Sequence, residues 1–161
     1  MEKKPIKRNE NIVNLSKDHH FTLLFCWKIR NGIKFKVEPE RIKKYVKYFW
    51  QHHIQPHFIQ EETILFSRVK DEAVQRALEE HIQIAQQIKA LDIAGDDAAY
   101  QLSALSDIVD NHVRYEEREL FPHLEKELTD EQLHMIGRQI GAEPHSLKDD
   151  FADEFWLKQK N

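Results

Sequence analysis

One pattern of histidine and glutamate occurs twice in the sequence. The motif H-x3-E-E-x2-L-F begins at His57 and begins again at His112. In an α-helix, side chains four positions apart lie one turn above each other, so each histidine lies beside the glutamate that follows it. The resulting pairs are His57 with Glu61 and His112 with Glu116. An imidazole and a carboxylate presented together are suitable metal ligands. The duplicated motif therefore predicts a metal site with one His-Glu pair bound from each copy.

An acidic residue followed by histidine precedes each copy of the motif. The two pairs are Asp18-His19 and Glu80-His81. Each pair lies on the predicted helix before its H-x3-E motif. The repeat therefore covers two helices in each half of the chain.

The position next to His19 is also a histidine, His20. His19 continues the helical face that includes Thr22 and Cys26. His20 instead shares a face with Ser16. We therefore expect His19 to point into the core, with His20 as the alternative.

A core with four histidines and two glutamates at one level needs partners for these groups. Burying an imidazole or a carboxylate without a partner costs several kcal/mol. Two metal ions remove this cost if both glutamates bridge them and two histidines bind each ion. Each ion then has room for solvent, an oxo or hydroxo bridge, or a small diatomic ligand. Such octahedral coordination favours iron or manganese, and zinc is a further alternative.

Four amphipathic helices are predicted to position these residues. Their expected limits are Asn14 or Ser16 to Asn31-Gly32, Pro39 to about Val69, Asp71 to Ala94, and Asp96 to the turns around Pro122. Pro56 lies inside the second helix, and we expect a kink just before His57. A tolerated bend around the core is favoured over a functional hinge.

Short connections between these helices favour an antiparallel up-down-up-down four-helix bundle, an all-α fold. Thr129 and Gln132 resemble a capping box for a short additional helix ending near Gly141. We expect a single domain over 1–161, with the bundle over about 12–128 and a C-terminal extension over 129–161.

The acidic tail carries large apolar residues at near-helical spacing. They are Leu147, Phe151, Phe155 and Trp156. We expect the tail to pack against the bundle, and a contact with a partner or a second copy is the alternative.

Composition excludes several other classes of protein. A net charge of −4 and a pI near 6.2 give no reason to expect nucleic acid binding. The sequence has no secretory signal and no apolar run of membrane-spanning length, so we expect no membrane partner. Cys26 is the only cysteine, which suits a reducing compartment, and we expect a cytoplasmic protein with Cys26 buried as a small apolar residue.

Taken together, the four-part pattern resembles the hemerythrin-like, or HHE cation-binding, family over roughly residues 12–128. The resemblance implies a non-haem di-iron centre, two iron ions with an oxo or hydroxo bridge, in a four-helix bundle. Carried over position by position, the implied metal ligands are His19, His57, Glu61, His81, His112 and Glu116.

The sequence departs from the oxygen-carrying branch of that family. Oxygen carriers use five histidines and place the last carboxylate five residues after the final histidine, whereas only four histidines match here. The pattern is closer to bacterial hemerythrin-like and iron-sulfur cluster repair relatives. Glu117 lies at the five-residue offset and stays a candidate ligand. Otherwise, Glu62 and Glu117 are interpreted as surface charges or as hydrogen-bond acceptors for the ligands.

Four further histidines are expected to lie outside the ligand set. His53 shares a face with His57, but Ile108 stands at its position in the second copy, so a supporting or solvent-facing role is expected. The remaining three, His123, His134 and His145, are interpreted as surface residues.

The predicted function is binding of oxygen or nitric oxide at a di-iron centre, for sensing, buffering or iron handling. A di-iron oxidoreductase or an iron-sulfur cluster repair protein is the alternative. A purely structural bundle would place Leu or Ile at Glu61 and Glu116. No catalytic residue outside the ligand set can be assigned, which favours binding of a small diatomic partner over turnover.

Overall fold

The computed structural model describes residues 7–142 and 149–158, which are mostly helical and contain no strand. The α-helices are α1 (Val13–Lys34), α2 (Pro39–Phe49), α3 (Gln55–Gln60), α4 (Glu72–Ala90), α5 (Ala98–Tyr115), α6 (Phe121–Glu127) and α7 (Asp130–Ala142). Between them lie the π-helical segments η1 (Trp50–Ile54), η2 (Glu61–Leu65) and η5 (Glu116–Leu120), and the 3-10 turns η3 (Phe66–Arg68) and η4 (Leu91–Ile93). The predicted all-α fold is confirmed.

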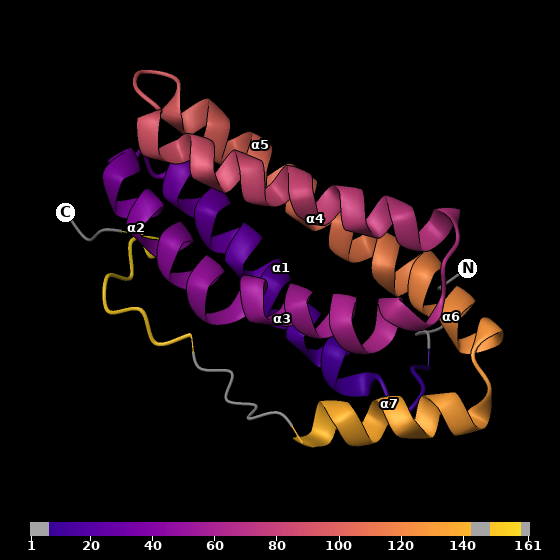
Figure 1. Cartoon of the computed structure of the whole chain (residues 1–161). Coiled ribbons are helices and arrows are strands. Elements are labelled where there is room, and N and C mark those ends of the chain that lie inside the picture. Colours follow the sequence, from indigo (N-terminus) through magenta and orange to yellow (C-terminus); the bar gives the residue numbers. More distant parts are fainter. Residues whose placement is uncertain (1–6, 143–148, 159–161) are drawn as a thin grey trace, which may run out of the picture.

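These elements join into long rods that pack side by side in a helical bundle (Figure 1). One rod is α1 and another is α4 with η4. A third runs without a break from α2 to η3, and a fourth runs from α5 to α6. Helix α7 lies outside the rods, as the predicted additional helix. None of the described helices is both long enough and apolar enough to cross a membrane.

Several helix starts follow their predicted local chemistry. Pro39 occupies the first turn of α2, where a missing amide hydrogen costs nothing. The Asp71 carboxylate accepts the Val74 amide at 3.0 Å and caps α4. Thr129 and Gln132 exchange backbone-to-side-chain hydrogen bonds at 2.9 and 3.1 Å, which confirms the capping box before α7.

The predicted limits of the first helix are wrong at both ends. Helix α1 begins at Val13 without a side-chain cap, and the Ser16 hydroxyl instead donates to Glu117 at 3.1 Å. At the other end α1 continues past Gly32 to Lys34. A Cβ at Gly32 would come within 2.8 Å of the Phe155 ring and 2.9 Å of the Ile42 side chain. This glycine therefore permits close packing and does not end the helix.

Each proline inside a rod follows a π-helical segment. Pro56 lies in the first turn of α3, directly after η1, and Pro122 lies in the first turn of α6, directly after η5. A π turn accommodates the hydrogen bond that proline cannot donate, so both rods continue. The kink itself stays a prediction.

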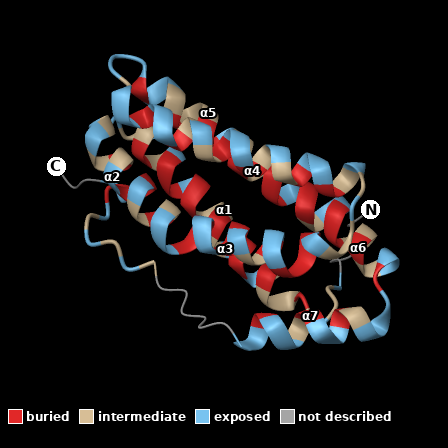
Figure 2. Ribbon diagram, in the orientation of Figure 1, coloured by how far each residue is buried: buried red, intermediate tan, exposed pale blue. Residues whose placement is uncertain are grey.

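The core consists of two apolar clusters. One includes Phe25 and Phe155, and the other includes Leu15 and Phe121. His19 lies between Leu15 and Phe25 on α1, so a polar level separates the two clusters. Figure 2 shows that the buried faces of the rods point toward one another along their length.

The C-terminal tail packs against the bundle, as predicted, over residues 149–158. Phe155 and Trp156 are buried in the first cluster, and Phe151 is half-buried against it. Asp149 accepts hydrogen bonds from Lys28 at 2.8 Å and from Tyr45 at 2.5 Å. Leu147, the first apolar residue predicted to make this contact, lies outside the described residues.

Candidate metal centre

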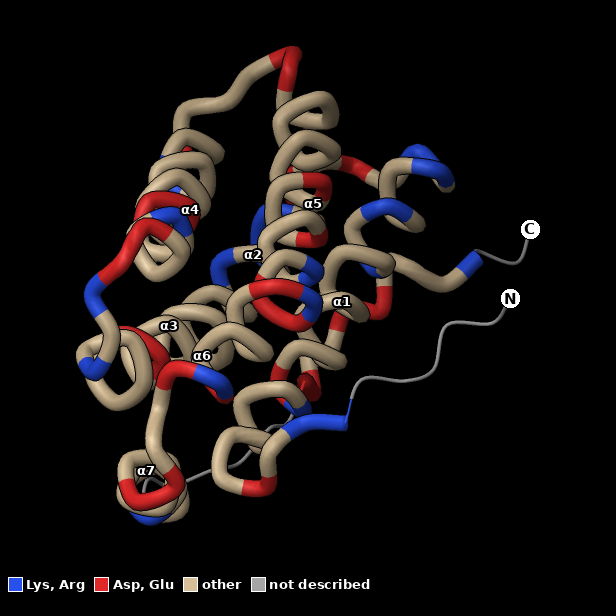
Figure 3. The backbone as a smooth tube through the Cα atoms, turned by 90° about the vertical axis from the view of Figure 1, so that its right-hand side faces the viewer, with Lys and Arg blue, Asp and Glu red and all other residues tan. Residues whose placement is uncertain are grey.

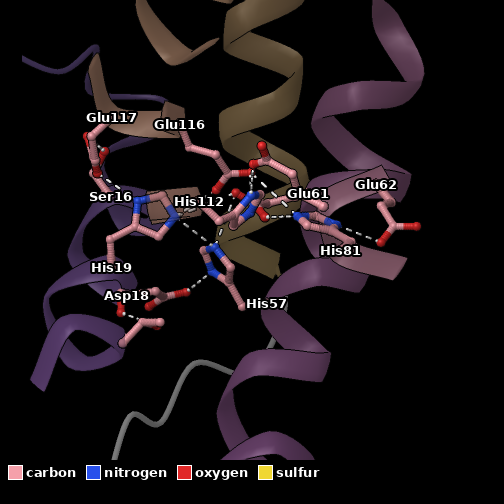
Figure 4. Close-up of polar contacts among 12 residues, drawn as sticks. Ser16, Asp18, His19, His57, Glu61, Glu62, His81, His112, Glu116 and Glu117 are labelled. Carbon is pink, nitrogen blue, oxygen red and sulfur yellow. Dashed lines mark hydrogen bonds and ion pairs between the residues drawn. The ribbon is translucent and has the colours of Figure 1, made fainter. Parts of the chain in front are cut away.

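All six predicted ligand side chains lie buried in the interior of the bundle (Figure 4). They come from α1, α3, η2, α4, α5 and η5, and they are, in that order, His19, His57, Glu61, His81, His112 and Glu116. Both glutamates are fully buried, with 0% exposure. The register that favours His19 is confirmed, since His20 is exposed.

The six side chains form two overlapping groups, each of a size suitable for one metal ion. One group is His19, His57, Glu61 and Glu116, and the other is Glu61, His81, His112 and Glu116. Within each group, one ligand atom from every residue lies within 4.8 Å of the others. Each half of the chain supplies the two histidines of one group, while both glutamates belong to both groups. This arrangement suits two neighbouring cations that share two carboxylates.

The outer nitrogen of each histidine is held by a carboxylate. Nδ1 of His57 lies 2.9 Å from Asp18, and Nδ1 of His112 lies 2.7 Å from Glu80. An ionised carboxylate only accepts hydrogen bonds, so each Nδ1 carries the proton. The sequence marked Asp18 and Glu80 as part of the repeat but did not predict this role.

The other two histidines are held by the glutamates that follow the predicted ligands. Nδ1 of His19 lies 2.8 Å from Glu117, and Nδ1 of His81 lies 2.9 Å from Glu62. Glu62 and Glu117 are therefore hydrogen-bond acceptors for the histidines, which is one of the two predicted roles, and not merely surface charges. With all four Nδ1 atoms occupied, the Nε2 atoms are the ones that face the centre.

The inward-facing atoms are incompletely satisfied. Five of them make no hydrogen bond to any described residue: Glu61 Oε1 and Oε2, Glu116 Oε2, His81 Nε2 and His112 Nε2. Several lie 3.2 Å apart, for example His81 Nε2 from Glu61 and His112 Nε2 from Glu116. Buried polar atoms without partners are costly, so this donor set fits bound cations.

The electrostatics of the protein without metal point the same way. Burial lowers the pKa of His57, but the charge of Glu61 and the hydrogen bond to Asp18 outweigh it and raise that pKa to about 9. Burial also opposes the shift at His81, where the nearby carboxylates of Glu116, Glu61 and Glu62 raise the pKa to about 11. Burial and the Glu116 charge raise the pKa of Glu61, yet the facing histidines lower it to about 2. The carboxylates therefore favour the protonated forms of His57 and His81, and a cation at the site would compete with those protons.

Aromatic rings fix the planes of two histidines. The Phe58 ring stacks on His81 with centroids 3.6 Å apart and planes 7° from parallel. The Phe121 ring stacks on His19 at 5.4 Å. Phe66, at the position of Phe121 in the first motif, lies 5.8 Å from His81. These contacts orient the imidazoles before any ion binds.

Each predicted bridging glutamate opens a π-helical segment. Glu61 is the first residue of η2, and Glu116 is the first residue of η5. The two segments occupy equivalent positions in the repeat, and π-helical turns often occur at functional sites. The spacing of four between histidine and glutamate fits an ordinary α-helix, so these π-helical segments could not be predicted from it.

The buried cation Arg8 is not among the residues that the sequence predicted for the site. Its guanidinium donates to the Glu117 carboxylate at 2.8 Å and to Glu125 at 2.8 Å. It also lies 5.3 Å from the centre of the Phe121 ring. Arg8 therefore fixes the glutamate that holds His19.

The other histidines only partly match their predicted positions. His53 is buried against Phe49, at 4.7 Å between ring centroids, so the solvent-facing role is wrong. His123 is partly exposed and lies 2.7 Å from Asp71, and His134 is exposed as predicted. His145 lies outside the described residues. Cys26 is buried as expected, and burial raises the pKa of its thiol to about 12.

A comparison with protein families matches residues 12–124 to the hemerythrin HHE cation binding domain. No curated protein and no solved structure matches the chain significantly.

Proposed function

The chain belongs to the hemerythrin HHE cation-binding domain family, and from that premise we propose that it is a di-iron protein which binds oxygen or nitric oxide. The proposed ligands are the six buried residues His19, His57, Glu61, His81, His112 and Glu116. The observation that carries the proposal is the orientation of the four imidazoles. Each gives its Nδ1 proton to a carboxylate and turns Nε2 toward two shared glutamates.

The chemistry of the donor set supports iron. Imidazole nitrogen and carboxylate oxygen, without thiolate, suit iron, manganese and zinc, and room for six ligands favours the first two. A pair of iron ions held here would supply open coordination positions for a small diatomic ligand. The protein itself contributes orientation, charge balance through Glu61 and Glu116, and an apolar surrounding that limits water.

A cavity of small-molecule size lies beside the outer edge of the centre. A cavity of about 260 Å³ is lined by Glu80 and His112, between α4 and α5. No residue lining this cavity, apart from His112, belongs to the ligand set, and none is an evident catalytic group, which favours binding of a small species for sensing, buffering or iron handling. We place binding before a turnover function on this ground.

The proposal includes the arrangement of the whole chain. We infer an up-down-up-down order for the four rods, since connections of a few residues between rods favour antiparallel neighbours. The rods, α7 and the tail form one domain in this proposal, because Phe155 and Trp156 complete the same core.

Metal analysis combined with optical spectroscopy tests this function. The purified chain, reconstituted with ferrous iron, should hold two ions per chain. Absorption of the oxidised centre should bleach with dithionite and return in air, or change on addition of nitric oxide. A stoichiometry of one or zero, or a spectrum indifferent to both gases, would overturn the proposal. The matched variant His20→Ala should behave as the parent, because His20 is exposed.

A further inference from the structure

The two halves of the repeat differ on the side that faces away from the centre. Glu117 holds His19 and also pairs with Arg8, whose side chain is only 5% exposed. Glu62 holds His81 in the same way, but its side chain is 43% exposed. Among the described residues, His81 is the only ion-pair partner of Glu62. Glu117 is therefore covered by a cation, whereas Glu62 is exposed to solvent.

Arg8 defines what a cation contacts at this position. Its guanidinium lies 2.8 Å from the Glu117 carboxylate and 5.3 Å from the centre of the Phe121 ring. A carboxylate and an aromatic ring together provide a charge-assisted hydrogen bond and a cation-π contact. The corresponding residues of the first motif are Glu62 and Phe66.

Glu62 and Phe66 both line a pocket of about 580 Å³. The pocket lies beside the connection between η3 and α4, where Figure 3 shows acidic and basic stretches close together. Its wall also includes the apolar residues Val69, Val74 and Leu78. The pocket therefore offers an exposed carboxylate beside apolar surface, while the Phe66 ring is nearly buried in its wall, at 3% exposure.

The charge of the lining favours a cation. Asp71 and Glu72 join Glu62 in the pocket wall, against one basic residue, Lys70. Asp71 is already engaged, since it caps α4 and pairs with His123. Glu62 and Glu72 remain as negative charges at the pocket.

Lys70 is the repeat counterpart of Arg8, because it lies 62 positions later, as His81 does from His19. It is exposed, and it forms no ion pair with Glu62 within the described structure. The flexible ammonium thus leaves open the position that the Arg8 guanidinium fills.

We propose that this pocket binds a small organic cation, an amidine, guanidine or amine on an apolar body, whose charge pairs with Glu62 as Arg8 pairs with Glu117 and whose body packs on the apolar wall of the pocket. A volume of this size is typical of small-molecule sites. A cation bound to Glu62 would contact His81, a proposed metal ligand, through that glutamate. An influence of the cation on the metal centre rests on the proposed metal function, whereas binding of the cation in the pocket does not.

The test uses benzamidine as the probe and the full chain without metal. Chemical shifts of backbone amides in an NMR titration should move for the lining residues, which lie between Glu62 and Leu78. Benzamide, neutral and of nearly the same shape, and benzoate, an anion, serve as controls. We expect benzamidine to bind at least about tenfold more tightly than benzamide, as a charge-assisted hydrogen bond implies. Equal binding of both, or shifts elsewhere only, would overturn the proposal.

Two variants move the affinity in opposite directions. Glu62→Gln keeps an oxygen for His81 but removes the charge, and should weaken benzamidine binding about tenfold. Lys70→Gln removes the competing cation from an exposed position, and should tighten binding about twofold to fivefold. Glu131→Gln, an exposed residue of α7, changes the net charge equally and should leave the affinity unchanged. An effect of Glu131→Gln equal to that of Glu62→Gln would indicate general charge attraction and refute the site. Because no metal is present, failure here leaves the di-iron proposal intact.

Discussion

Glu80 accepts the Nδ1 proton of His112 at 2.7 Å, although the two residues lie on different helices. Such an outer hydrogen bond orients a ligand histidine and raises its basicity. We therefore expect Glu80→Ala to lower metal affinity by about 10-fold to 100-fold, measured by competition with a chelator. Glu79→Ala, at the exposed neighbouring position, should leave the affinity unchanged, and Glu80→Gln should restore part of the loss. Equal affinities for Glu80→Ala and Glu79→Ala would remove Glu80 from the site.

Glu61 belongs to both proposed ion positions, so its loss should affect both. We expect Glu61→Ala to lose more than half of the bound metal, as counted by elemental analysis of the folded protein. Glu127→Ala, at an exposed position of α6, is the control. Retention of two metal ions per chain by Glu61→Ala would show that this glutamate does not bridge.

His19 and His20 provide an internal comparison of adjacent identical residues. His19 is buried among the site residues, whereas His20 is exposed. We expect His19→Ala to lose metal and His20→Ala to bind the full amount. If His20→Ala lost metal and His19→Ala did not, the side of α1 that carries His20 would face the centre, and the proposed ligand set would be wrong.

The pH dependence of stability should change sign when metal is added. The pKa of His57 in the metal-free fold is about 9, above its ordinary value of 6.5. Its protonation stabilises the metal-free fold below pH 6.5, and that contribution is lost as the pH rises through 9. Metal binding strengthens over the same range, because protons no longer compete for the imidazoles. As the pH rises from 6 to 9, the thermal unfolding midpoint of the metal-free protein should therefore fall relative to that of the metal-loaded protein. Equal changes of both midpoints with pH would contradict this prediction.

Gly32 tests how firmly the tail is packed. A Cβ at this position would meet the Phe155 ring and the Ile42 side chain at less than 3 Å. We expect Gly32→Ala to lower the free energy of unfolding by about 1–3 kcal/mol, as overpacking of a core does. Gly141→Ala is the matched control, since nothing lies within 4 Å of a Cβ there. Urea unfolding of both variants measures the difference.

The convergence of the six residues on one level was predictable because it depends on helical spacing. His57 with Glu61, and His112 with Glu116, need only the i to i+4 relation of a helix. The choice of His19 over His20 needed only the continuation of an apolar face. Repetition of the whole pattern supplied the pairing of the two halves.

What the sequence left open depends on contacts between distant segments. Glycine often ends a helix, but at Gly32 the helix continues because Phe155, far along the chain, packs closely beside it. Arg8 reaches Glu117 and Glu125 across more than a hundred residues. The π-helical segments at Glu61 and Glu116 change the turn without changing the residue types. Local patterns carry no information about such contacts.

The sharing of Glu61 and Glu116 between both groups has a consequence for how the centre fills and empties. A single divalent ion already balances the charge of both carboxylates, whereas two such ions together exceed it. The second ion should therefore bind more weakly than the first unless a bridging anion enters with it, and filling at limiting iron should pass through a chain with one ion.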